Sequence, residues 1–186
     1  MVTPGTFAVG GFLTVPSTEY ANGGNATKST LNFGYTMNSV MVAACAVVKS
    51  DIAVSMQNVH VSELPATGAT AYPTNFGIDL TCESSARPQI TLTDAATPFN
   101  QTTELTLAPG STASGIAIQI IYNDTLVRLG PAPIYYSGSG PAITNALDLG
   151  NVSGEIHLPF TARYKRTGDI TPGTILGRAT FTFTYQ

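Results

Sequence analysis

Residues 155–164 read Glu-Ile-His-Leu-Pro-Phe-Thr-Ala-Arg-Tyr, and large apolar side chains occupy every second position of this stretch. A period of two places successive side chains on opposite faces of a β-strand. We therefore expect a strand with one face in a core and the other in water. Residues 76–82 and 178–186 alternate in the same way, and we predict strands there too.

Further strands are predicted outside these three stretches, at 31–43, 46–61, 88–93, 103–108 and 115–122. Residues 116–121 are apolar on nearly both faces, so we expect that strand to be central. No helical period extends over about 12 residues or more. Short strands between regular turns, in a chain with 18 Gly and 12 Pro, predict an all-β sandwich.

The composition of the 186 residues excludes several classes of function. Only 10% of the residues are charged, 43% are hydrophobic, and the net charge is −3. A chain so poor in cations lacks the electrostatic footprint of a nucleic-acid-binding protein and of a basic membrane-surface helix. No apolar run reaches the roughly 18 residues of a membrane span. High apolar content with low net charge also argues against disorder.

The chain contains few residues suited to catalysis or metal binding. Its only histidines, His60 and His157, lie in predicted strands, and His157 lies on a polar face where we expect it to meet solvent. Short-spaced metal-ligand clusters and the common hydrolase and phosphate-loop motifs are absent. We therefore predict no enzyme, no metal and no cofactor. The cationic spot of Arg163, Lys165 and Arg166 is interpreted as a solvated strand face.

Cys45 and Cys82 are the only cysteines. An even count in a charge-poor chain favours one disulfide and an oxidising compartment, while the alternative is two buried free thiols in a cytosolic protein. The start of the chain lacks the pattern of a signal peptide. If the protein is secreted, we interpret the sequence as a mature form or a fragment in which Met1 need not be natural.

From Cys45 onwards, the order of features resembles the pilin domain of bacterial chaperone–usher fimbriae of the type 1 pilus kind. The first cysteine follows a strand, the second closes residues 76–82, and residues 115–120 look like that family's central strand. The C-terminal end is the most specific part of the resemblance. A penultimate tyrosine and a glycine fourteenth from the end are hallmarks of the family, and here they are Tyr185 and Gly173.

The resemblance implies an incomplete immunoglobulin-like β-sandwich that lacks its last strand, with the disulfide Cys45–Cys82. An apolar groove then lies beside the C-terminal strand, and a periplasmic pilus chaperone covers it. During assembly through an outer-membrane usher, a β-strand of a neighbouring subunit replaces the chaperone. The protein would then be a structural or adhesive subunit of an extracellular fimbrium. The residues expected to line the groove and bind the chaperone are Ile156, Leu158, Phe160, Gly173, Phe181, Phe183 and Tyr185. Without the resemblance, the same residues would be assigned to the core face of a complete sandwich.

Residues 1–44 are longer than the segment that ordinary pilins place before their first cysteine. We favour the interpretation that residues 1–44 end a preceding receptor-binding domain of a two-domain tip adhesin, with the pilin domain at 45–186. In the alternative, the chain is a one-domain shaft or minor pilin with a long donor extension. The possible donor strand then consists of the alternating residues Phe7, Val9, Gly11, Leu13 and Val15.

Other classes of function remain as alternatives. A host-cell receptor, expected to be a glycan, would be bound only by a complete adhesin domain, because residues 1–44 are too short to hold a whole pocket. A secreted carbohydrate-binding β-sandwich should expose clustered aromatic residues, and Tyr135-Tyr136 is the only adjacent pair. A small hydrolase on a β scaffold should bring His or carboxylate side chains together in a cleft.

Overall fold

A computed structural model of the chain describes residues 45–136, 140–142 and 144–185, apart from the side chains of 134–143. The chain divides into two units, Met1–Val42 and Ala43–Gln186, and the description below concerns the second. The predicted strand at 31–43, the possible donor strand at 7–15 and the assignment of residues 1–44 lie outside the described residues.

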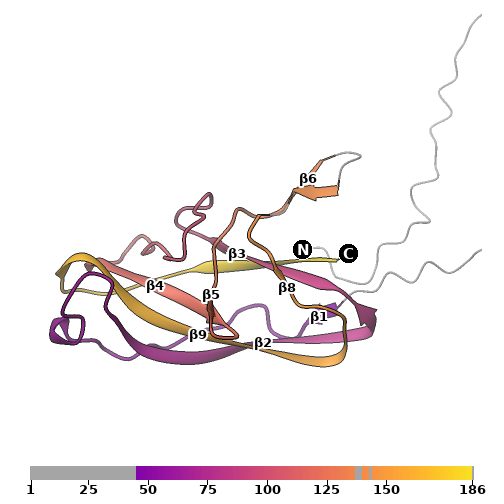
Figure 1. Cartoon of the computed structure of the whole chain (residues 1–186), viewed down its shortest axis with the longest axis horizontal. Coiled ribbons are helices and arrows are strands. Elements are labelled where there is room, and N and C mark those ends of the chain that lie inside the picture. The colour runs from indigo at the N-terminus through magenta and orange to yellow at the C-terminus, as the bar shows by residue number, and fades with distance from the viewer. Residues whose placement is uncertain (1–44, 137–139, 143, 186) are drawn as a thin grey trace, which may run out of the picture. The chain divides into compact units, whose positions relative to one another are not determined.

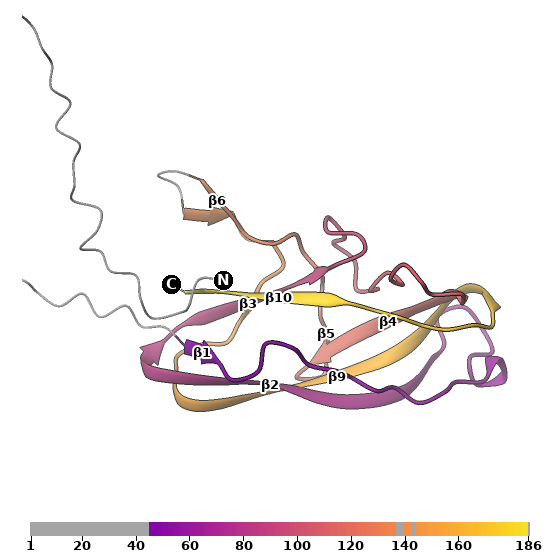
Figure 2. The same ribbon diagram turned by 180° about the vertical axis from the view of Figure 1, so that it is seen from behind.

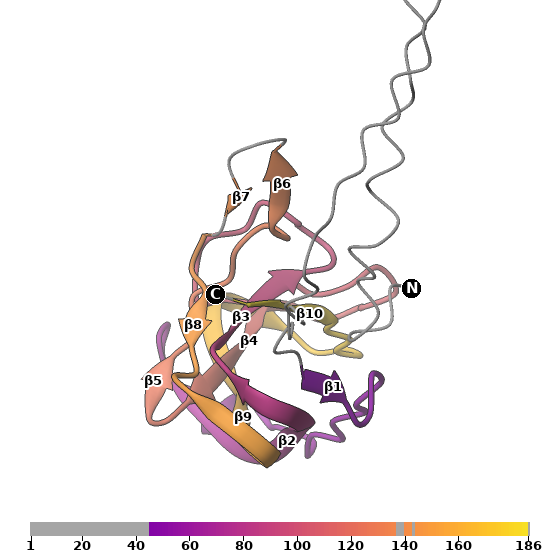
Figure 3. The same ribbon diagram turned by 90° about the vertical axis from the view of Figure 1, so that its right-hand side faces the viewer.

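Two antiparallel sheets form the described domain (Figures 1 and 3). The first sheet contains, in spatial order, β1 (Cys45–Val47), β2 (Thr70–Ala86), β9 (Val152–Thr171), β4 (Ser114–Tyr122) and β5 (Thr125–Leu126). The second sheet contains β10 (Ala179–Tyr185), β3 (Pro88–Asp94) and β8 (Leu147–Asp148). A small hairpin, which lies on the outer side of the second sheet in Figure 3, is formed by β6 (Ile134–Tyr136) and β7 (Gly140–Ala142). The described residues contain no α-helix, only the 3₁₀ turn η2 (Val61–Glu63).

The core lies between the sheets and follows the predicted alternation. β9 is the central strand of the first sheet, with Phe160 opposite Phe76 on β2 and opposite Tyr122 on β4. The Phe160 ring is 1% exposed, and its centroid lies 5.5 Å from that of Phe76 and 4.9 Å from that of Tyr122. Ile90 and Leu92 of β3 belong to the same buried cluster, so side chains of both sheets build one core.

The predicted strands at 76–82, 88–93, 115–122 and 155–164 are confirmed as parts of β2, β3, β4 and β9, and the one at 178–186 is confirmed over Ala179–Tyr185, which is β10. The strand expected at 103–108 is wrong, because only two isolated bridges form there, Leu105 with Ile118 and Leu107 with Gly177. Residues 116–120 of β4 are buried on both faces, as expected, but the central strand of the sheet is β9.

The strand expected at 46–61 is also wrong, because the observed strand is β1, which ends at Val47. Within the described part of the chain, residues 49–59 make no backbone–backbone hydrogen bond. Their side chains still alternate, with Ile52, Val54 and Met56 half-buried against the core and the residues between them exposed. The local period predicts the direction of side chains, but a ladder also needs a neighbouring strand.

Part of the threonine face of β3 and β10 is buried, whereas the alternation at 178–186 predicted that Thr184 would meet water. Thr91, Thr93 and Thr184 are 1%, 5% and 2% exposed, and their hydroxyls have no hydrogen-bond partner within the described residues. The connection from β5 to β9 returns along this sheet, since the Gly130 N–H donates to the Leu92 carbonyl at 2.9 Å and β8 pairs with β3. An unbonded buried hydroxyl opposes folding because it has lost its hydrogen bonds to water.

The substitution Thr91→Val is expected to leave the free energy of unfolding unchanged or to raise it by about 1 kcal/mol, because it replaces an unbonded hydroxyl with a methyl group of similar shape. Urea unfolding monitored by circular dichroism measures the effect. Thr174→Val is the matched control, since the Thr174 hydroxyl bonds to that of Thr112 at 3.1 Å and its loss should destabilise. A clear destabilisation by Thr91→Val would show that this hydroxyl is bonded in solution.

Candidate strand-binding groove

β10 pairs with β3 along one edge, and its other edge has no partner strand within the described residues. In an antiparallel pair, every second residue directs its N–H and C=O groups toward the neighbouring strand. Arg178 lies opposite Ala95, and its carbonyl accepts a hydrogen bond from the Ala95 N–H. Every second residue after Arg178, namely residues 180, 182 and 184, therefore also forms backbone hydrogen bonds with β3. Phe181, Phe183 and Tyr185 therefore direct their backbone groups toward the free edge.

A second unpaired edge belongs to β1 and the segment that follows it. The Val48 N–H donates to the Asp79 carbonyl at 2.9 Å, which makes Cys45 and Val47 the β1 residues whose backbone groups point away from β2. Residues 49–59 continue from β1 without backbone bonds to any other described residue. Half-buried Ile52, Val54 and Met56 line this segment, so an apolar face accompanies the unpaired backbone.

These two edges run beside one another along the length of the domain (Figure 2). At one end Cys45 contacts Tyr185, and at the other Met56 and Val59 face Gly173 and Ile175 across a cavity of about 500 Å³. We call the strip between residues 47–60 and β10 the groove. It offers backbone donors and acceptors on both sides and apolar side chains between them, which are the requirements of one additional β-strand.

Gly173 lies at the open end of the groove, where residues 111–113 approach residues 172–174. A Cβ atom at position 173 would lie 2.5 Å from both the Ala113 nitrogen and the Thr112 Oγ1 atom. The Thr112 and Ala113 N–H groups donate to the Thr174 carbonyl, and the Thr174 N–H donates to the Thr112 hydroxyl at 2.8 Å. The glycine is therefore required by close backbone approach.

Gly173→Ala is expected to lower the free energy of unfolding by about 1–3 kcal/mol, because the added methyl group must displace the backbone of residues 112–113. Thermal and urea unfolding of the full chain measure the change. Gly168→Ala serves as the control, since a Cβ atom there meets no atom within 4 Å. Equal stability of the two variants would contradict the close approach.

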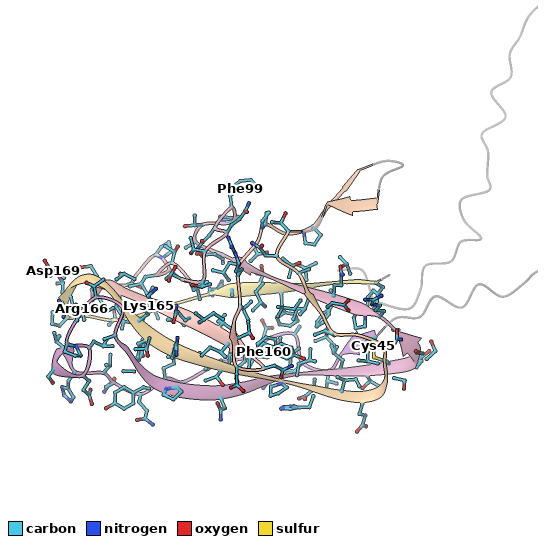
Figure 4. The ribbon with its side chains drawn as sticks, viewed as in Figure 1. Cys45, Phe99, Phe160, Lys165, Arg166 and Asp169 are labelled. Atoms are coloured by element: carbon cyan, nitrogen blue, oxygen red, sulfur yellow. A yellow bond between two sulfur atoms is a disulfide. The ribbon has the colours of Figure 1, made fainter. Side chains whose placement is uncertain are left out.

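The loop that borders the open end is held in place by Arg166. Its Nη1 donates to the carbonyls of Leu64 at 2.9 Å and Pro65 at 3.1 Å, and its Nε donates to the Gly168 carbonyl at 2.8 Å. Figure 4 shows Arg166 and Cys45 near opposite ends of the long strands. The Glu63 carboxylate accepts hydrogen bonds from the Tyr72 hydroxyl and the His60 N–H, which hold the pKa of Glu63 below its usual range. This wall of the cavity is thus fixed by polar contacts.

At the closed end, Tyr185 bridges the two sheets. Its hydroxyl donates to the Cys45 carbonyl at 2.8 Å and accepts from the Cys45 N–H at 3.2 Å. Burial raises the pKa of the Tyr185 hydroxyl, and the hydrogen bond with the Cys45 backbone opposes that rise. The predicted disulfide between Cys45 and Cys82 is present and links β1 to β2.

The structure separates the residues predicted to line the groove into two groups. Phe181, Phe183 and Tyr185 are half-buried on β10, and Gly173 lies at the cavity. The β9 residues lie deeper: Leu158 is 3% and Phe160 1% exposed, while Ile156 is half-buried. Their role as groove residues stays a prediction.

Residues 49–59 form a groove wall that the sequence analysis did not assign, although their alternation was visible. That alternation was interpreted as a strand of the sheet, so it was not recognised as a wall with an unpaired edge. The signal was present in Ile52, Val54 and Met56, but nothing in the sequence marked which backbone edge would stay free.

The other polar candidates do not converge on one site. The side chain of His157 is 64% exposed, as expected, and its Nδ1 atom lies 2.6 Å from an Asp79 carboxylate oxygen. The three cations of β9 have separate partners: Arg163 donates to Gln119, Lys165 pairs with Glu104, and Arg166 holds the loop described above. Among the described residues, no group of three or more His, Cys, Asp or Glu side chains could hold a metal ion.

Among the described residues, there is no helix that is long and apolar enough to cross a membrane.

Comparisons with known proteins agree with this architecture. The family model described as fimbrial protein matches residues 31–186. The F17c-G fimbrial adhesin of Escherichia coli is 30% identical over 174 residues, which cover 89% of this chain and 49% of the adhesin, so the chain spans about half the length of that relative. The type-1 fimbrial protein A chain of Escherichia coli is 30% identical over 167 residues, 87% of this chain and 88% of that protein.

The P pilus rod subunit PapA shares the fold. Its crystal structure aligns with a TM-score of 0.56 and 21% identity, covering 76% of this chain and 99% of that chain. The described domain is accordingly an incomplete immunoglobulin-like β-sandwich of the pilin type, as the resemblance implied. The family is one of structural and adhesive proteins of the extracellular cell surface and not of enzymes. The chain belongs to the fimbrial protein family.

Proposed function

We propose that this domain joins a chaperone–usher fimbria by donor-strand complementation, with the groove taking an extended strand from a neighbouring subunit. The observation that supports this proposal is the pair of unpaired backbone edges, β10 and residues 47–60, which border one apolar strip. Main-chain hydrogen bonds from an added strand supply affinity, and its alternate side chains supply register.

The same edge explains the need for a chaperone before assembly. An unpaired strand with half-buried Phe181 and Phe183 is a template for aggregation unless another chain covers it. In this proposal a periplasmic pilus chaperone covers the groove first, and the strand of the neighbouring subunit replaces it at the outer-membrane usher.

Within the fibre, we favour the C-terminal portion of a tip adhesin, with residues 1–44 as the end of a receptor-binding domain and 45–186 as the pilin domain. The match to half of an F17 adhesin supports this placement. A host receptor, expected to be a glycan, would be bound by the complete adhesin domain. The alternative, a shaft or minor pilin, is supported by the match along most of the type-1 A chain. The donor strand would then consist of Phe7, Val9, Gly11, Leu13 and Val15.

Amide hydrogen exchange tests the complementation. The full chain is exported to the periplasm with and without a co-expressed type-1 pilus chaperone, and exchange is followed by NMR. The amides of Phe181 and Phe183 should exchange rapidly in the free chain and slowly in the complex. Those of Thr180 and Thr182, which face β3, should be protected in both and serve as the internal control. Protection of Phe181 and Phe183 in the free chain, persisting after deletion of residues 1–30, would contradict the proposal.

The place in the fibre is tested with a synthetic peptide of residues 5–17. If these residues are a donor strand, saturating peptide added to the chain lacking residues 1–30 should raise its stability by about 2.7 kcal/mol at a hundredfold excess over Kd. An adhesin fragment should not respond to this peptide, although the chaperone should still protect it. Peptide binding would therefore favour the shaft subunit, and its absence the adhesin.

A further inference from the structure

A contact that the proposed function does not use joins Tyr185 to Cys45. A single phenol hydroxyl engages both backbone groups of Cys45, its N–H at 3.2 Å and its carbonyl at 2.8 Å. These residues are 140 positions apart and belong to different sheets. The contact therefore joins the edges of the two sheets at one end of the groove.

The backbone groups of Cys45 are the ones that an inserted strand would use. Cys45 lies opposite Cys82 at a position where β1 and β2 exchange no backbone hydrogen bonds, so its N–H and C=O point toward the groove. Val47 points the same way and has no backbone partner within the described residues. An inserted strand can pair with Val47, but at Cys45 the Tyr185 hydroxyl already occupies both groups.

The position of this contact is fixed mainly from the Cys45 side. Cys45 is fully buried, and its disulfide to Cys82 prevents β1 from moving away from β2. On the other side, Tyr185 ends β10 opposite Pro88, directly after Thr184, whose backbone groups bond to β3. Cys45 cannot withdraw without disturbing the β1–β2 pair, so the contact forms a boundary at this end of the groove.

We propose that the Tyr185 hydroxyl is the end stop of the groove: it saturates the Cys45 backbone, ends the inserted strand beside Val47 and so sets the register of that strand. Tyr185 is a specificity-determining residue in this proposal, which rests on donor-strand complementation. Because register decides which side chain of the inserted strand enters which pocket, the stop selects among strands that share the same alternation.

The first test follows two amides in the wild-type full chain by hydrogen exchange. The probe is a nested set of alternating Thr-Val peptides, each two residues longer than the last, with lysines at the ends for solubility. The Cys45 amide should be protected with or without peptide, and the Val47 amide should become protected when peptide binds. Peptide binding that leaves Val47 unprotected, or a Cys45 amide that exchanges freely in the chain without peptide, would overturn the end stop.

The second test compares the peptide series on Tyr185→Phe, which removes the hydroxyl and keeps the ring. Freeing the Cys45 N–H and C=O lets a longer peptide add two hydrogen bonds, so one lengthening step should tighten binding about tenfold in the variant and less than twofold in the wild type. Tyr122→Phe is the matched control, since the Tyr122 ring packs on Phe160 away from Cys45 and its hydroxyl has no partner among the described residues.

The outcomes separate this inference from the proposed function. If no peptide of the series binds the wild-type chain lacking residues 1–30 and the chaperone also leaves the Phe181 amide unprotected, donor-strand complementation fails. If peptides bind and lengthening has the same effect on the wild type and on Tyr185→Phe, complementation stands and the end stop is wrong. If Tyr185→Phe does not fold, the hydrogen exchange of the Cys45 and Val47 amides in the wild-type chain still tests the end stop.

Discussion

Replacing both Cys45 and Cys82 with serine is expected to lower the free energy of unfolding by about 4 kcal/mol, from the chain-entropy cost of a loop of this size. The disulfide joins residues 37 positions apart and anchors β1, which has only three residues. Without it, Cys45 would leave the core, and the backbone contact with Tyr185 would be lost as well.

Urea unfolding of the full chain, oxidised and reduced, measures this effect. Reduction of the wild-type chain should reproduce the loss seen in the serine variant, while the same reductant should leave the variant unchanged. The Cys45 amide, which bonds to the Tyr185 hydroxyl, should lose its protection in the reduced protein. A loss below about 1 kcal/mol would mean that β1 is held mainly by its pairing with β2 and Tyr185.

Asp94→Asn is expected to cost about 3 kcal/mol at neutral pH, because hydrogen bonds to a buried charge are stronger than neutral ones. The Asp94 side chain is 0% exposed, and its carboxylate accepts from the N–H groups of Ala96, Thr97 and Thr106 and from the Asn100 side chain, at 2.8–3.1 Å. Replacing one oxygen with an amide NH₂ places a donor against donors. These bonds shape the loop from 95 to 106, which presents Phe99, 79% exposed (Figure 4).

The effect of Asp94→Asn should depend on pH in one direction. Burial raises the pKa of Asp94, but the hydrogen bonds from Asn100, Thr106 and Thr97 together lower it by more than burial raises it. The pKa of Asp94 in the folded protein therefore lies below the usual value. A depressed folded pKa gives stability that is present above the unfolded pKa of about 3.9 and is lost as the pH falls through the folded pKa. The difference between wild type and variant should therefore shrink below about pH 4.

Urea unfolding between neutral and acidic pH checks this dependence. Asp169→Asn is the matched control, because the Asp169 side chain is exposed and its distance to Arg166 is 3.5 Å. We expect that control to change stability by less than about 0.5 kcal/mol. An Asp94→Asn deficit that persists unchanged in acid would show that the lost interaction does not depend on the charge of Asp94.

Only part of the candidate groove could be predicted from the sequence. Alternation placed Phe181 and Phe183 on one face of a strand, and the family resemblance directed attention to Gly173 and Tyr185. The same alternation in residues 49–59 was assigned to a paired strand, because a period of two reports side-chain direction and not backbone pairing. The burial of the threonines of β3 was not predicted for a similar reason. These side chains are covered by the connection from β5 to β9, which lies far from them along the chain.

The sequence by itself determined the all-β class, most strands and the faces that enter the core, because these follow from local alternation and turn residues. It also supplied the two cysteines and the C-terminal signature that indicated the family. Only the tertiary structure decided which backbone edges stay unpaired and which atoms close the groove. The pairing of Cys45 with Tyr185 joins residues 140 positions apart, and such contacts depend on the order of strands in space, which no local pattern encodes.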